Sequence, residues 1–179
     1  YIAEPQKHPK PRVATLSKLC GVLHYDPLTL IAHVERVHAV AASLNIPINH
    51  LLVNAVITAY AKATTLLTSV DQQMDLCGAM MEYLDAARES ISWSEDQLPI
   101  TYGVAIRAWA ECNTPMASQQ VRLLWDNAIA EEVPLDILTH NHVMRAQMHN
   151  PPNQAKQVFD HIQTHSMPNL RTWKYLFMA

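Results

Sequence analysis

Residues 137–179 indicate the fold most clearly, and they read ILTHNHVMRAQMHNPPNQAKQVFDHIQTHSMPNLRTWKYLFMA. Within it, four apolar residues follow one another at i, i+3, i+4 and i+7: Ala155, Val158, Phe159 and Ile162. This spacing places all four on one face of an α-helix, which predicts an amphipathic helix packed on a neighbour. Pro168 then marks a turn, because a proline cannot continue the preceding helix.

The same helical spacing recurs along the rest of the chain. It is found at Leu16, Leu19, Cys20 and Leu23; at Val53, Val56, Ile57 and Tyr60; at Cys77, Met80, Met81 and Leu84; at Tyr102, Ala105, Ile106 and Trp109; at Val121, Leu124, Trp125 and Ala128; and it begins once more at Trp173, Leu176 and Phe177. No stretch keeps the strict alternation that is typical of a half-buried strand. The sequence therefore predicts an all-α protein.

These helices also form a repeat. Segments that align with one another lie around Asn54, Gly103, Asn141 and Lys174, and the turns before them contain Pro47, Pro99, Pro134 and Pro168. The unit is a helix–turn–helix of about 35 residues, and stacked units of this kind build an α-solenoid. We expect four units plus one opening helix over residues 13–179, after an extended basic arm at residues 1–12. An insertion is expected within about residues 64–98, with its extra residues in surface loops at 64–73 and 90–97.

Composition limits the classes of function. The chain has 179 residues, of which 49% are hydrophobic and 16% charged, so it can fold without disulfides or bound metals. Its three glycines are isolated, which argues against glycine-rich phosphate loops. Its three cysteines form no CxxC pair, which indicates a reducing compartment and no zinc site. No apolar run approaches the roughly 20 residues of a membrane span, and we expect neither a cofactor nor a membrane partner. Because the first residue is Tyr1, we expect a segment or a processed form.

Four segments resemble the first helix of a pentatricopeptide repeat: LLVNAVITAYAKA, ITYGVAIRAWAEC, ILTHNHVMRAQMH and LRTWKYLFMA. QAKQVFDHIQTHSMPN resembles the second helix with its closing turn, and QQVRLLWDNAIAEEVPLD does so more loosely. The tetratricopeptide repeat has a similar period, but its Trp, Leu-Gly pair and Tyr are missing at their fixed spacing. The resemblance covers about residues 13–179 and implies a role in RNA biology inside an organelle such as the mitochondrion.

The resemblance also implies base-reading positions. In that family each repeat can present two side chains to one RNA base, one near the start of the first helix and one at the end of the repeat. Carried over by position, the pairs are Ser17 with Asn49, Asn54 with Leu98, Gly103 with Asp136, and Asn141 with Asn169, while Lys174 opens the next. The first pair resembles an adenine-type combination and the fourth a pyrimidine-type one. Leu98 has no polar side-chain group and Gly103 no side chain, so two repeats each lack a reader.

The charge distribution weighs against base-by-base reading. Residues 75–136 hold 11 acidic residues and three arginines, within a chain of net charge −3. A single-strand binder normally follows the phosphates with a basic groove, so these acids would repel RNA unless they all face outward. In the arm, Lys7, Lys10 and Arg12 are candidates for contacts with the RNA backbone, although an ordinary polar tail has the same composition.

Other candidate sites are weaker. His161 and His165 are spaced i, i+4 beside Asp160, but no third ligand follows at a defined spacing, so a solvated helix face is favoured over a metal. His140 stands where the repeat usually has a packing aromatic residue. No Ser–His–Asp or Cys–His arrangement stands out, so we expect no catalytic residues. Trp93 is the tryptophan outside the apolar stripes and a candidate for a partner contact.

Three hypotheses remain. The first is a non-enzymatic scaffold, an RNA-associated subunit of an organellar ribonucleoprotein with the mitochondrial ribosome or its assembly machinery as host. Such a subunit contacts RNA and other proteins and has no small-molecule substrate. The second is a sequence-selective factor that binds single-stranded RNA in the processing, editing or stability of organellar transcripts. The third, an enzyme, requires a catalytic domain outside this segment.

Overall fold

A computed structural model describes residues 15, 16, 18, 19, 27–112, 117–148 and 152–179. Within these ranges the chain forms eight long helices and no strand, which confirms the all-α prediction. The helices are α2 (Leu30–Ser43), α3 (His50–Leu66), α4 (Val70–Ser90), α5 (Gln97–Glu111), α6 (Ala117–Ala130), α7 (Ile137–Gln147), α8 (Pro152–His165) and α9 (Leu170–Met178). None of them combines the length and apolar character that are needed to cross a bilayer.

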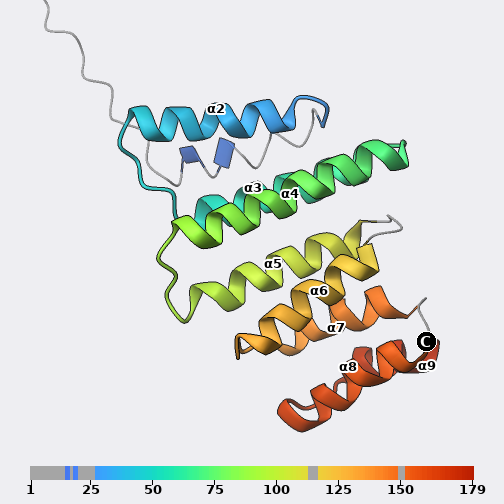
Figure 1. The fold of residues 1–179 in the computed structure, drawn as a ribbon. Helices are drawn as coiled ribbons and strands as arrows, with labels where there is room; N and C mark the ends of the chain where they lie inside the picture. Colours follow the sequence, from blue (N-terminus) through green and yellow to red (C-terminus); the bar gives the residue numbers. More distant parts are fainter. Residues whose placement is uncertain (1–14, 17, 20–26, 113–116, 149–151) are drawn as a thin grey trace, which may run out of the picture.

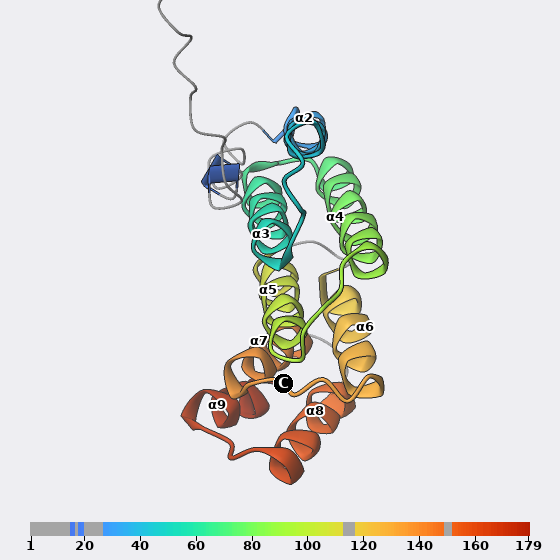
Figure 2. The same cartoon turned by 90° about the vertical axis from the view of Figure 1, so that its left-hand side faces the viewer.

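The helices lie in two rows (Figures 1 and 2). We call α3, α5, α7 and α9 the first-helix row, because each packs on the next: α3 on α5, α5 on α7 and α7 on α9. The second-helix row contains α4, α6 and α8, and these pack on α3, α5 and α7 respectively. Each successive pair is therefore a helical hairpin whose first helix lies against the first helix of the next hairpin.

The apolar stripes of the sequence form the core between the two rows. All four stripe residues of α3, α5, α6 and α8 are buried, and Trp109 of α5 is one of the largest fully buried side chains. In α4 three of the four stripe residues are buried, while Met81 is partly buried and accepts a hydrogen bond from Trp109 Nε1 at 3.1 Å. The stripe of α9 differs, because Trp173 is 40% and Phe177 81% exposed. The face of α9 that the sequence pattern predicts to be packed is covered in part only.

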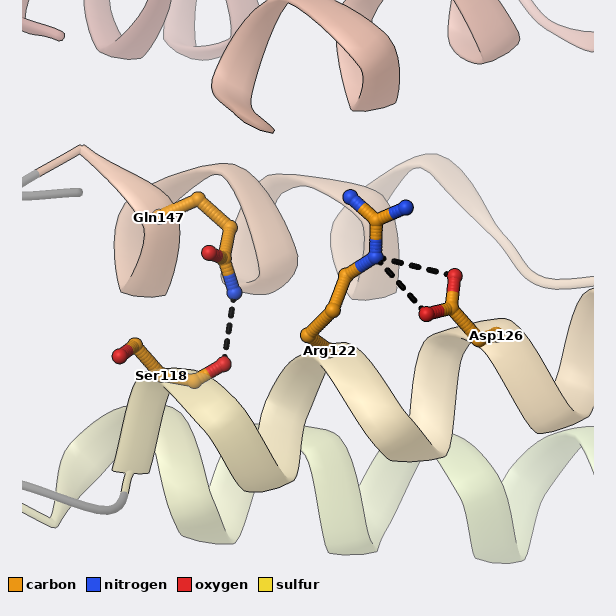
Figure 3. Close-up of polar contacts among 4 residues, drawn as sticks. All are labelled: Ser118, Arg122, Asp126 and Gln147. Carbon is orange, nitrogen blue, oxygen red and sulfur yellow. Dashed lines mark hydrogen bonds and ion pairs between the residues drawn. The ribbon is translucent and has the colours of Figure 1, made fainter. Parts of the chain in front are cut away.

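One hydrogen bond joins the end of α7 to the start of α6, and an ion pair lies within α6 (Figure 3). Gln147 is fully buried, and its Nε2 donates to the carbonyl oxygen of Ser118 at 2.7 Å. On the same helix α6, Arg122 Nε donates to both carboxylate oxygens of Asp126, at 3.0 and 2.9 Å. The Arg122 guanidinium also lies 4.9 Å from the ring centre of Trp125. Because a buried amide must find a partner, the Gln147 bond sets where α7 ends relative to α6.

Two helices end in a left-handed residue. Asn45 after α2 has φ 52° and Glu132 after α6 has φ 55°. At both ends the next residue donates its N–H back into the helix, Ile46 to Ala41 O and Val133 to Ala128 O, each at 2.8 Å. This is the usual helix stop with a left-handed residue, a position that favours glycine or asparagine.

The structure corrects two boundary predictions. Residues 64–73 were expected to form a surface loop, but the break between α3 and α4 covers 67–69 only, and Thr64 is buried. Thr64 stays helical because its Oγ1 donates to the carbonyl oxygen of Tyr60 at 2.8 Å. Pro99, expected in a turn, lies in the first turn of α5, where backbone N–H groups have no helical partner to lose. A loop does span residues 91–96, within the second expected loop.

Some expectations concern residues outside the described ranges. These are the arm at residues 1–12 with Lys7, Lys10 and Arg12, the reader position Ser17, and the stripe residues Cys20 and Leu23. Of the first stripe, Leu16 is buried and Leu19 is exposed.

Candidate nucleic-acid interface

Positions four residues apart define one face of the first-helix row. The predicted reader positions of these helices are Asn54, Gly103, Asn141 and Lys174. Four residues after each lie Thr58, Arg107, Arg145 and Met178, and Lys62 follows after four more in α3. Residues spaced by four lie on the same face of a helix. We call the surface formed by these positions the ladder face.

Charge separates between the two rows. The first-helix row carries Lys62, Arg107, Arg145, Arg171 and Lys174 against a single acid, Glu111. The second-helix row carries Arg88, Arg122 and Lys156 against seven acids: Asp71, Asp75, Glu82, Asp85, Glu89, Asp126 and Asp160. The acidic middle of the sequence is therefore concentrated in the second-helix row and the α6–α7 turn. Most of these acids lie outside the helices of the first-helix row, but Glu111 pairs with Arg107 and Asp136 lines a hollow beside Gly103.

A shallow hollow of about 230 Å³ lies on the ladder face between α5 and α7. Its lining includes Gly103, Arg107, His142 and one acid, Asp136, together with aliphatic residues. Partial burial lowers the pKa of His142, Glu111 opposes this effect, and the nearby positive charges of Arg107 and Arg145 lower it further. These two arginines thus lie close to one imidazole at the hollow, and the imidazole is held in its neutral form.

Exposed aliphatic side chains accompany the cations. Leu51 is 51% exposed, Ile100 55% and Leu138 48%, and each lies three residues before a predicted reader position. These side chains recur at equivalent positions beside the cations, but none is an aromatic ring on which a base could stack. These residues were not among the predicted site residues, although their constant spacing of three residues before Asn54, Gly103 and Asn141 is visible in the sequence.

The predicted readers at the repeat ends cap helices. Asn49 accepts a hydrogen bond from the backbone N–H of Leu52 at 3.3 Å, and Asp136 accepts one from Thr139 at 2.7 Å. Asn169 forms a complete capping box with Thr172 at the start of α9. Leu98 lies inside α5 rather than at a cap. Asn and Asp are preferred at this position because they satisfy N–H groups that the helix leaves free.

The structure brings the fourth predicted pair together. Asn141 Nδ2 donates to Asn169 Oδ1 at 3.2 Å, and Thr172 Oγ1 donates to Asn141 Oδ1 at 2.7 Å. Asn141 is only 3% exposed. In the second repeat Asn54 Oδ1 accepts a hydrogen bond from Thr101 Oγ1 at 2.9 Å. Both asparagines therefore bond to a buried threonine of the next first helix.

Gly103 occupies the same place without a side chain. A Cβ at Gly103 would lie 2.9 Å from Thr139 Oγ1, closer than real Cβ contacts. Thr101, Thr139 and Thr172 are all buried, at equivalent positions of successive first helices. We call these contacts, Asn54 to Thr101, Gly103 to Thr139 and Asn141 to Thr172, the threonine ladder. Three of the predicted reader positions are thus used to join neighbouring helices.

Trp93 lies in the loop between α4 and α5. It is partly buried against the core and lines a hollow of about 520 Å³ together with Asp85, Glu89 and Glu131. The neighbouring Arg88 forms an ion pair with Glu131 and lies over the Tyr102 ring, whose hydroxyl donates to Glu131 at 3.0 Å. Burial raises the pKa of Tyr102, which keeps this hydroxyl a donor. Trp93 is therefore on the acidic side of the molecule, away from the ladder face.

No three His, Cys, Asp or Glu side chains in the described part of the chain come together as they would around a metal ion. Cys77 and Cys112 are both free and buried. Comparison with models of known protein families finds no match for this chain, and comparison with curated protein sequences finds none either.

Proposed function

We propose that this protein is a non-enzymatic α-solenoid of the pentatricopeptide type that binds single-stranded RNA along its ladder face as a structural subunit of an organellar ribonucleoprotein. The proposed host is the mitochondrial ribosome or its assembly machinery. The observation that carries the proposal is the separation of charge. A net positive first-helix row faces the RNA, while the acids of the second-helix row lie on the other side.

The intramolecular contacts of the reader positions favour RNA binding that does not select particular bases. The side chains of Asn54 and Asn141 already form hydrogen bonds within the protein. Gly103 has no side chain with which to read a base. Side chains that already have intramolecular partners gain less from a base edge, because an existing hydrogen bond must be exchanged. The exposed cations bind phosphates of any sequence, and of these Arg107 also lies 3.8 Å from the carboxylate of Glu111.

The salt dependence of RNA binding tests this interface. The affinity of the whole chain for an oligouridylate is measured by fluorescence anisotropy over a range of salt concentrations. Arg107→Gln combined with Arg145→Gln removes two ladder-face cations, and we expect the slope of log K against log salt to fall by about 1.4, since each single-strand phosphate contact contributes about 0.7.

The matched control is Arg36→Gln with Lys156→Gln, which removes two exposed cations from α2 and α8. It changes net charge equally but leaves the ladder face intact, so its slope should equal that of the parent protein. Equal effects of the two double variants would contradict binding on the ladder face.

A sequence-selective factor is the second candidate, favoured by the contact between Asn141 and Asn169, because the two predicted readers of one base lie together. Asn141→Ala would then relax base preference at one position by about 1 kcal/mol or more. An unchanged preference excludes this candidate.

The proposed host is tested by sedimentation of the tagged protein from mitochondrial lysate, with and without ribonuclease. Co-migration with a ribosomal subunit or precursor supports the proposal. Light fractions that shift after ribonuclease treatment favour the transcript-binding factor instead.

A further inference from the structure

Three histidines form a stack beside a pocket at the lower end of the molecule. The rings of His140 and His161 are stacked with centres 5.6 Å apart, and those of His161 and His165 lie 4.2 Å apart. The pocket between this stack and the α6–α7 turn has a volume of about 490 Å³. Apolar residues form its opposite wall, and Glu132 and Ser166 also line it. Its volume is in the range of pockets that hold a small group or a side chain.

The pocket presents hydrogen-bond acceptors. His140 Nδ1 lies 2.9 Å from the carbonyl oxygen of Asp136, which can only accept, so Nδ1 carries the proton and Nε2 the lone pair. The side chain is 97% buried, and this Nε2 has no partner. His165 Nδ1 lies 2.6 Å from Thr164 Oγ1 and 3.0 Å from the carbonyl oxygen of His161, so its contacts do not assign the proton to one nitrogen. A buried acceptor without a donor is unfavourable, and a ligand that donates to it removes that cost.

Burial lowers the pKa of His140, so the ring stays neutral and its Nε2 keeps the lone pair. Burial also lowers the pKa of His161, and the neighbouring rings of His165 and His140 lower it further. Neutral rings at His140 and His161 do not repel a cation, and the Glu132 carboxylate that lines the pocket attracts one.

Glu132 itself has an unusual backbone. Its φ of 55° lies in the left-handed region, where a glutamate is less stable than the glycine or asparagine that usually ends a helix. Asn45 fills the equivalent place after α2 with a suitable residue. Backbone strain at a pocket is a common companion of function, and here the strained residue supplies the only carboxylate among those that line the pocket.

We propose that this pocket binds the guanidinium group of an arginine from a protein partner, stacked on the histidine rings and hydrogen-bonded to His140 Nε2 and Glu132. The guanidinium is planar and carries five N–H donors and no acceptor, so it matches a lining of flat rings and acceptors. Because the His161 ring is stacked over His140, binding requires His161 to change rotamer before the donor reaches His140 Nε2, a change of the kind that is common on binding. The pocket lies between the two rows, where residues of α6, α7 and α8 line it.

The lysine ammonium fits less well, because it is a compact and strongly hydrated charge without a face that stacks. The imidazole stack also does not converge on a point, and the described residues contain no group of three ligands for a metal ion.

The experiment titrates the full chain with Nα-acetyl-arginine methylamide and follows the imidazole signals of His140, His161 and His165 by NMR. The lysine analogue and the citrulline analogue, which is flat but neutral, serve as probe controls. We expect the arginine probe to shift all three rings and to bind about tenfold more tightly than either control, as a charge-assisted hydrogen bond requires. Equal binding of citrulline, or no shift of the three rings, would overturn the proposal.

Variants locate the site. His140→Phe keeps a flat ring but removes the acceptor, and Glu132→Gln removes the charge without changing the shape of the side chain. Both should weaken binding of the arginine probe several-fold, whereas Glu95→Gln in the α4–α5 loop should leave it unchanged. If His140→Phe disturbs folding, Glu132→Gln alone decides, and an unchanged affinity in that variant would sink the proposal.

A second arm distinguishes the source of the arginine. A peptide with one central arginine between glycines should bind at least as tightly as the capped amino acid. Tighter binding of free arginine, with its own ammonium and carboxylate, would show a small-molecule site and refute docking of a protein.

Discussion

Gly103 sets the distance between α5 and α7 by having no side chain. In the other rungs of the threonine ladder the asparagine and the threonine bond to each other, and the helices lie far enough apart to hold both side chains. At Gly103 the place of the asparagine is empty, and Thr139 Oγ1 comes within 2.9 Å of where a Cβ would stand. A glycine inside a helix normally lowers stability, so this one is kept for the close approach.

Alanine substitution separates the two effects. Gly78→Ala in α4 meets no atom within 4 Å and should raise the free energy of unfolding by about 1 kcal/mol, the usual helix-propensity gain. Gly103→Ala should show no such gain, because the new methyl group presses on Thr139. In a Thr139→Ala background the gain should return. Urea denaturation of the four proteins forms the cycle, and equal gains at both glycines would contradict the contact.

His140 makes stability depend on pH. Burial lowers its pKa below the ordinary 6.5, so below that pH the unfolded chain binds a proton that the folded chain does not. The free energy of unfolding therefore falls as pH decreases from about 6.5 towards the folded-state pKa, with a slope of up to about 1.4 kcal/mol per pH unit. His140→Phe should flatten this slope between pH 5 and 6.5 in urea titrations. At pH 8 both proteins hold neutral side chains and the slopes should coincide; identical slopes at every pH would contradict a neutral His140.

Helix α6 is followed by a residue type that is unfavourable in the left-handed backbone conformation. Glu132 adopts the same left-handed conformation that Asn45 adopts after α2. Glu132→Gly should raise the free energy of unfolding by about 1 kcal/mol by removing the strain of a left-handed residue with a Cβ. Asn45→Gly, the matched control, should gain less, because asparagine tolerates this conformation. Thermal or urea unfolding measures both, and an equal or smaller gain at Glu132 would show that its backbone is unstrained.

The elements show which features the sequence could predict. Helical spacing predicted α3 to α6 and α8, and every stripe residue of these helices except Met81 is buried, because burial between two rows is what produces that spacing. It could not place the end of α3, since Thr64 and Thr65 are polar residues whose hydroxyls bond back to helix carbonyls. Nor could it foresee the histidine stack, because His140 and His161 come together only through the packing of α7 on α8.

The reader positions show the same limit. Asn141 and Asn169, which the sequence alignment pairs, lie in contact with each other. The threonines that contact these positions could not be predicted from the repeat pattern, because each threonine belongs to the following repeat. The number of residues between a reader position and its threonine varies with the length of the intervening helices. Contacts between repeats are decided by how helices stack, which a pattern within one repeat does not contain.

In the molecule as a whole, the two rows differ in charge. The first-helix row forms continuous contacts from α3 to α9 and carries the excess of positive charge, while α4, α6 and α8 carry the acids. The histidine pocket lies between the rows, because His140 of α7 and His161 of α8 both line it. A stack of this kind has no single central core, so its stability should vary along its length.

Hydrogen exchange tests this gradient. Helix α5 packs on α3, α6 and α7, whereas α9 packs on α7 and α8 and leaves Phe177 exposed. Amides of α5 should therefore exchange slowest and those of α9 fastest. Met144→Ala removes a fully buried side chain of α7 and should cost about 2–5 kcal/mol locally. If repeats are coupled only to their neighbours, the variant should lose protection in α7 to α9 and keep most of it in α3. An equal loss in every helix would show that the chain unfolds as one cooperative unit, in spite of its repeats.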